Sequence, residues 1–100
     1  MARFKVKILR KVQEDLIDTV EYLNTLSPQA ALRYYDLLTE KISGLSEMPE
    51  RCASVRDEQL RLRGYRFMIV ENYTVFFVIE NDTVQIRRIL HYRRQYEHLL

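Results

Sequence analysis

The chain reads GYRFMIV at residues 64–70, YTVFFVI at residues 73–79 and VQIRRIL at residues 84–90. All three stretches are rich in β-branched and aromatic residues, which favour β-strands. The polar pair Asn81 and Asp82 is typical of a tight turn between the last two strands, and Gly64 interrupts the first. The sequence therefore predicts an antiparallel meander, in which residues 60–70 form one strand or two short strands that meet at the glycine.

A further strand and two helices are predicted on the N-terminal side of this meander. Residues 3–9 alternate basic and apolar side chains with the two-residue period of a half-buried strand. Apolar residues then recur at helical spacing from Lys11 to about Asn24, and Ser27 followed by Pro28 is a typical start of a second helix. Four acidic residues of the first helix are expected on the solvent side, opposite its apolar stripe: Glu14, Asp15, Asp18 and Glu21.

The second helix is expected to end near Gly44, and residues 46–59 have no periodic pattern, so they are interpreted as a connecting loop. One hundred residues in this order predict a single α+β domain over residues 1–100, arranged β-α-α-β-β-β. The helical hairpin should pack on one face of a mostly antiparallel sheet, and a short helix after the last strand would complete the chain.

Composition narrows the classes of function. No apolar run reaches the roughly 18 residues of a membrane span, and the N-terminus does not resemble a signal peptide, so we expect a cytoplasmic protein without a membrane partner. Cys52 is the single cysteine, and with His91 and His98 it gives no zinc-ligand spacing. We therefore expect no disulfide, no metal and no cofactor.

The arginines are distributed unevenly along the chain. The net charge is only +2, but residues 51–100 carry nine arginines and no lysine, whereas residues 1–50 carry seven basic and eight acidic side chains. Arginine contacts phosphate or carboxylate at two points, which lysine does less well. Arg66, Arg87 and Arg88 lie inside strand patterns, where they require an anionic partner. They are followed by a basic and aromatic segment that contains His91, Tyr92, Arg93 and Arg94.

The order of these elements resembles that of the RelE/ParE superfamily of bacterial type II toxins, over nearly the whole chain. The matching motifs are SPxxA at 27–31, PER at 49–51, GYR at 64–66, NYxVFF at 72–77 and RILH at 88–91 followed by Arg93 and Arg94. The resemblance implies a toxin that forms a hetero-oligomer with a cognate antitoxin. It implies one of two targets, because RelE-like members cut mRNA on the ribosome, whereas ParE-like members poison DNA gyrase and are not nucleases.

Metal-free mRNA cleavage would require a general base, a general acid and fixed cations around the phosphate. Under this hypothesis His91 is the base or acid, Tyr92 donates a proton or stacks on a base, and Arg66 and Arg88 hold the phosphate. Further residues predicted to contact RNA or another target are Arg63, Arg87, Arg93, Arg94 and Tyr96. We expect ribosome-dependent mRNA cleavage, with gyrase inhibition as the alternative.

Several features leave these assignments open. Asp57 and Gln59 fall where RelE-like nucleases usually carry lysines, which favours a ParE-like mechanism. The alternative role of Arg66 and Arg88 is an ion pair with Glu71, Glu80 or a helix acid, and that of His91 is a hydrogen bond at a strand end.

Leu99 and Leu100 would be exposed apolar residues at a chain end. We expect that they bind the antitoxin or fold back on the sheet.

Overall fold

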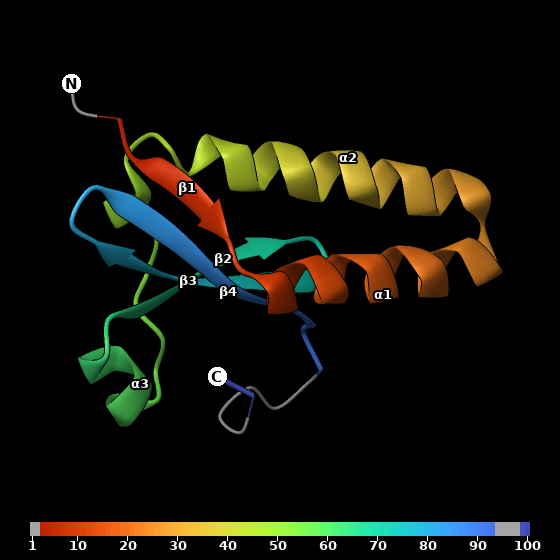
Figure 1. Ribbon diagram of the computed structural model, residues 1–100. Coiled ribbons are helices and arrows are strands. Elements are labelled where there is room, and N and C mark those ends of the chain that lie inside the picture. The colour runs from red at the N-terminus through yellow and green to blue at the C-terminus, as the bar shows by residue number, and fades with distance from the viewer. Residues whose placement is uncertain (1–2, 94–98) are drawn as a thin grey trace.

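The computed structural model describes residues 3–93 and 99–100. Its elements follow the order shown in Figure 1: β1 (Lys5–Ile8), α1 (Arg10–Leu26), α2 (Pro28–Gly44), the 3-10 turn η1 (Pro49–Arg51), α3 (Glu58–Leu62), β2 (Tyr65–Val70), β3 (Tyr73–Glu80) and β4 (Thr83–His91). This order confirms the α+β fold and the helical hairpin predicted from the sequence. The short helix expected after the last strand falls mainly on residues 94–98, outside the described residues.

Two short helical segments differ from the sequence prediction, because residues 46–59 are not entirely loop and the strand begins only at Tyr65. The carboxylate of Asp57 accepts a hydrogen bond from the amide of Leu60 at 3.0 Å, which caps α3, and Leu60 itself is buried. Gly64 follows with φ of +87°, a left-handed conformation that favours glycine. The glycine therefore separates a short helix from β2, rather than two strands.

The sheet has the strand order β1-β4-β3-β2. β1 runs parallel to β4, with Val6 opposite Val84, whereas the other two pairs are antiparallel. The register between β3 and β4 shifts at Phe76 and Phe77, so Arg87 is an extra residue in β4. Residues 53–55 continue the sheet beyond β2 through hydrogen bonds of 3.1 Å in each direction.

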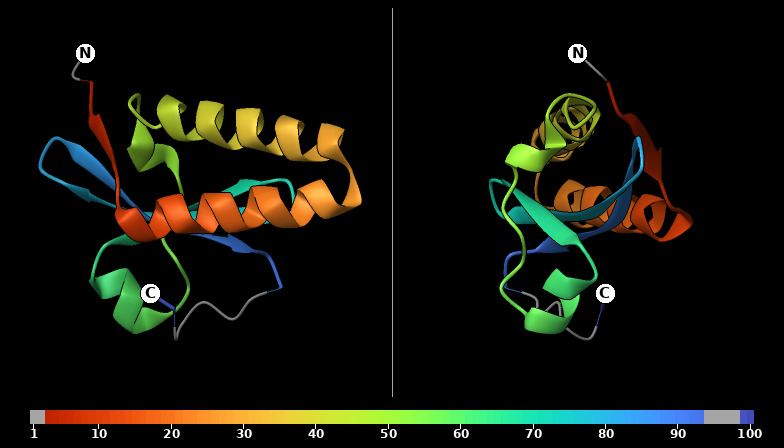
Figure 2. Two further views of the ribbon diagram at one scale, coloured as in Figure 1. Left: turned by 45° about the vertical axis from the view of Figure 1, so that its right-hand side comes forward. Right: turned by 90° about the vertical axis from the view of Figure 1, so that its left-hand side faces the viewer.

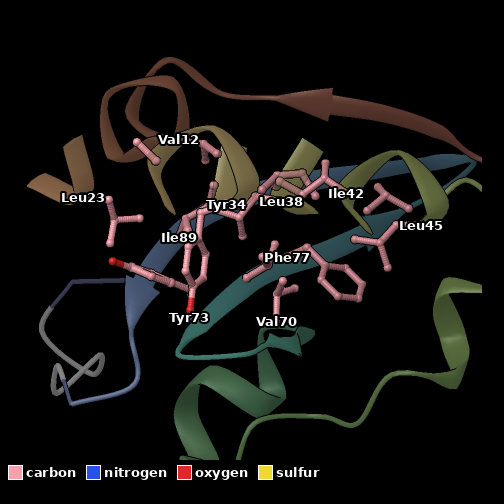
Figure 3. Close-up of a cluster of buried hydrophobic side chains, with 14 residues drawn as sticks. Val12, Leu23, Tyr34, Leu38, Ile42, Leu45, Val70, Tyr73, Phe77 and Ile89 are labelled. Atoms are coloured by element: carbon pink, nitrogen blue, oxygen red, sulfur yellow. The ribbon is translucent and has the colours of Figure 1, made fainter. Parts of the chain in front are cut away.

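The two helices cover one face of the sheet, while α3 and the C-terminus lie on the other, as Figure 2 shows. α2 begins at the predicted cap, because the Ser27 hydroxyl accepts a hydrogen bond from the amide of Ala30 at 3.2 Å. Side chains of both helices and of β2, β3 and β4 form the main core (Figure 3), in which Leu38, Phe77 and Ile86 are fully buried.

A smaller core lies on the second face of the sheet. Its buried members are Val55, Leu60, Tyr65, Phe76, Val78 and Leu90. Leu99 and Leu100 are half-buried against this cluster, so in the free chain they fold back on the sheet, which is one of the two expected arrangements. No helix in the described part of the chain is both long enough and apolar enough to cross a bilayer.

Candidate functional site

Arg88 is held by Asp15 in a buried ion pair that joins β4 to α1. Its Nε and Nη2 atoms donate to the two carboxylate oxygens at 2.7 and 3.0 Å, and the Arg88 and Asp15 side chains are only 12% and 6% exposed. The same carboxylate accepts the backbone amide of Ile89 at 3.0 Å, and Nη1 of Arg88 donates to the carbonyl of Leu99 at 3.1 Å. All three guanidinium nitrogens therefore have partners inside the protein. An ion pair with an acidic residue of a helix was the alternative role given for Arg88.

Asp15 was expected on the solvent side of the first helix, and that expectation was wrong. The expected stripe was Val12, Leu16, Val20 and Leu23. Val12 and Leu23 are buried and Leu16 and Val20 are partly buried against the core, but Asp15 and Thr19 are buried as well. Sequence reasoning missed Asp15 as a partner of the arginines. Its position three residues after Val12 was the available signal, because residues three and four apart share a helix face.

Arg66 holds the loop that precedes α3. Its Nη1 donates to the carbonyls of Glu50 and Cys52 at 3.1 and 2.6 Å. Glu71, which was considered as its partner, instead accepts two hydrogen bonds from Arg33 at 2.7 and 3.1 Å. These hydrogen bonds are the main reason that the pKa of Glu71 lies below its ordinary value.

His91 and Tyr92 lie together at the end of β4. The two ring centroids are 4.6 Å apart, and the His91 ring meets Tyr73 edge to face at 5.4 Å. Nδ1 of His91 accepts the amide of Arg93 at 3.3 Å, while Nε of Arg93 donates to the Tyr92 hydroxyl at 3.0 Å. Tyr73, which was expected only as packing, is buried, and this burial raises its pKa.

Arg63 and Arg87 both approach the ring of Tyr65. Their guanidinium carbons lie 5.5 and 5.9 Å from the ring centroid, within the range of cation–π interactions. Arg87 also donates from Nη2 to Gln85 at 3.0 Å, whereas its buried Nε has no hydrogen-bond partner among the described residues. Arg94 and Tyr96, the remaining predicted contact residues, lie outside the described residues.

An apolar pocket of about 220 Å³ lies on the second face of the sheet, beside His91 and Tyr92. Its apolar lining consists of Val55, Phe67, Ile69, Phe76 and Leu90, and its polar lining of Arg56, Thr74, His91 and Tyr92. A second, more polar hollow of about 300 Å³ lies between α1 and β4, and His91 and Leu90 line both. The structure thus brings His91, Tyr92 and Arg93 together beside the apolar pocket. Arg88 lines the second hollow with His91 but is paired with Asp15, and Arg66 binds loop carbonyls.

The chemistry of the site is set by arginines, one histidine and aromatic rings. Within residues 3–93 and 99–100, no group of three or more His, Cys, Asp or Glu side chains could hold a metal ion. Arg56 is a pocket residue that the sequence analysis did not select, because nothing local distinguishes it from the other arginines of this region. Its position beside the pocket depends on the pairing of residues 53–55 with β2.

Chains of two solved toxin–antitoxin structures share this fold. A chain of the chromosomal ParDE toxin–antitoxin system from P. aeruginosa is 22% identical with a TM-score of 0.76, over 91% of this chain and 98% of that one. A chain of the RelBE2 toxin–antitoxin complex from Mycobacterium tuberculosis is 24% identical with a TM-score of 0.64, over 89% of this chain and 98% of that one. No protein with a curated description matches the chain.

These two likenesses show that the fold is shared. A family model described as the ParE toxin of the type II toxin–antitoxin system, parDE, matches residues 6–96, and the chain therefore belongs to this family. It is the toxin component of a type II toxin–antitoxin system.

Proposed function

We propose that this toxin is a non-enzymatic inhibitor of DNA gyrase that a cognate antitoxin holds inactive. The buried pair between Arg88 and Asp15 carries the proposal, because an arginine that is bound at both ends of its fork by a carboxylate cannot also hold a phosphate without breaking that pair. This reverses the order of the two mechanisms expected from the sequence.

A second arginine that was proposed to hold the phosphate is also engaged within the protein. Arg66 already donates to two loop carbonyls, and Asp57, at a position where RelE-like nucleases usually carry lysine, caps α3. A transition state that gathers negative charge on phosphate requires several positioned cations. Around His91, Arg93 contacts Tyr92, Arg56 lines the apolar pocket, and Lys11 and Arg88 line the second hollow. Arg88 is already held by Asp15, which supports a binding function over RNA cleavage.

One observation favours mRNA cleavage as the second candidate. His91 and Tyr92 have ring centroids 4.6 Å apart beside an open pocket, which is an arrangement that could stack on an unpaired base and transfer a proton. Under that mechanism Arg88 would have to leave Asp15 on the ribosome, at the cost of a buried carboxylate without its partner.

The experiment that separates the two candidates uses the purified chain in two reactions. Supercoiled plasmid with gyrase should accumulate linear DNA after detergent treatment, while mRNA in a reconstituted translation system should keep its original 5′ ends. New 5′ ends within translated codons, together with no linear plasmid, would refute gyrase inhibition and support the nuclease.

His91→Ala gives a second criterion. Removal of a general acid or base typically lowers the rate by about 100-fold or more, whereas loss of one contact from a binding surface has a smaller effect. We expect the variant to inhibit gyrase within about tenfold of the unaltered toxin. Unchanged antitoxin binding would serve as the control for folding.

For the antitoxin, we propose contacts with Leu99 and Leu100. Both residues are half-buried on the second face of the sheet, and the Leu99 carbonyl is bound by Arg88. An antitoxin segment that covers them should slow hydrogen exchange of their amides. Equal exchange rates with and without antitoxin would rule this contact out.

A further inference from the structure

The second face of the sheet is only partly covered. α3 and the last two residues pack over Tyr65, Phe76 and Val78, but among residues 3–93 and 99–100 no side chain packs over the part of this face nearest the β2–β3 turn. There Ile69 is 66% exposed and Tyr92 is 55% exposed, and both line the apolar pocket. A hollow of this kind, formed by apolar side chains on rigid strands, is typical of an interaction site.

The size of the pocket indicates what it can hold. Its volume of about 220 Å³ is below the roughly 300–1,000 Å³ of most small-molecule sites. Protein interfaces, in contrast, are commonly anchored by one large apolar side chain that fills a pocket of the partner. The pocket therefore fits a protein segment with a single anchoring side chain better than it fits a metabolite.

The charges around the pocket indicate what should flank that anchor. None of the described residues that line it is acidic, and Arg56 lines one side without an ion pair to any described residue. Arg93 lies over the ring of Tyr92, with its guanidinium carbon 5.5 Å from the centroid, and it too has no acidic partner in the described part of the chain. Arg56 thus lines the hollow, and Arg93 lies on Tyr92 at its edge, so the two arginines from separate segments complement carboxylates on either side of an apolar residue.

We propose that the toxin binds its target protein through this pocket. The pocket would bind an apolar side chain that is flanked by Asp or Glu in an exposed acidic segment of that target. The inference rests on the proposed function, because it assigns the surface that contacts gyrase. Arg63 and Arg87 beside Tyr65 extend the same positive region along the sheet.

Site-specific crosslinking tests this assignment directly. A benzophenone amino acid is placed at Ile69, inside the pocket, or at Ile17, which is 55% exposed on the helical hairpin. After illumination with purified gyrase, Ile69 should give a covalent adduct that maps to an acidic segment, and Ile17 should give none. Absence of an adduct from Ile69, or equal adducts from both positions, would overturn the assignment.

Charge reversal provides a matched pair of variants. Arg56→Glu should weaken binding to gyrase at least tenfold, whereas Arg10→Glu, the same change at an exposed position on α1, should stay within threefold. Both variants should melt at the temperature of the unaltered toxin. Equal effects of the two reversals would mean that overall charge, and not the pocket, governs binding.

Failure of this inference is distinguishable from failure of the proposed function. If the unaltered toxin produces linear plasmid but Ile69 gives no adduct, the pocket assignment is wrong and gyrase inhibition stands. If the unaltered toxin leaves gyrase unaffected, the proposed function is wrong and the assignment of the pocket to gyrase fails with it.

Discussion

Asp15→Ala tests the reasoning about the buried ion pair most directly. The substitution removes the acceptor of three N–H groups at once: Nε and Nη2 of Arg88 and the amide of Ile89. The Arg88 side chain is only 12% exposed, so its charge would stay buried with the Leu99 carbonyl as its remaining partner. Removal of one member of a buried pair typically costs about 3–5 kcal/mol, and this geometry fits that range.

Urea denaturation followed by circular dichroism measures this loss. With a slope of about 2 kcal/mol per M, a loss of 3–5 kcal/mol lowers the midpoint by about 1.5–2.5 M. Asp18→Ala is the matched control, because it makes the same change three residues further along α1 at an exposed position. It should change the free energy of unfolding by no more than about 0.5 kcal/mol.

A third variant tests whether the loss of stability comes from leaving the Arg88 charge buried without its partner. Asp15→Leu combined with Arg88→Met replaces both charges by apolar side chains and should recover most of the stability lost in Asp15→Ala. If Asp15→Ala costs no more than Asp18→Ala, the pair does not stabilise the fold. The argument that Arg88 is unavailable to phosphate would then lose its basis.

Three further predictions concern local contacts. Because hydrogen bonds from Arg33 lower the pKa of Glu71, their stabilisation should be complete above the ordinary carboxyl pKa and lost as pH falls through the lower folded pKa. The stability difference between the unaltered chain and Glu71→Gln should therefore be constant near neutral pH and shrink below about pH 4; a difference that is constant to pH 3 would contradict this. Burial raises the pKa of the Cys52 thiol, so iodoacetamide at pH 8 should alkylate it more slowly than it alkylates glutathione, and an equal rate would count against it. Ser27→Ala should cost about 1 kcal/mol through loss of the α2 cap, while Ser43→Ala on the same helix should cost less, and equal losses would argue against the cap.

The sequence by itself determined the elements and their order. Strand and helix signals are local, since the β-branched and aromatic content of β3 and β4 and the cap at Ser27 involve neighbours along the chain. The same locality explains why α3 was missed in the predicted loop. Asp57 forms a short cap with only five helical residues after it, too few for a helical period to appear in the sequence.

Only the tertiary structure decided which charged groups are free. The buried side of α1 carries Asp15 and Thr19 beside Val12 and Leu23, and Asp15 contacts Arg88, which lies 73 residues away in the chain. The sequence predicted anionic partners for Arg66, Arg87 and Arg88. The prediction is confirmed for Arg88, which binds Asp15 in α1, whereas Arg66 binds loop carbonyls and Arg87 binds Gln85.

The pocket likewise depends on the tertiary structure. Its lining comes from the loop before α3, from β2 and β3, and from the end of β4. Hydrogen bonds and pockets between distant segments depend on how the elements pack, and no local pattern encodes that packing.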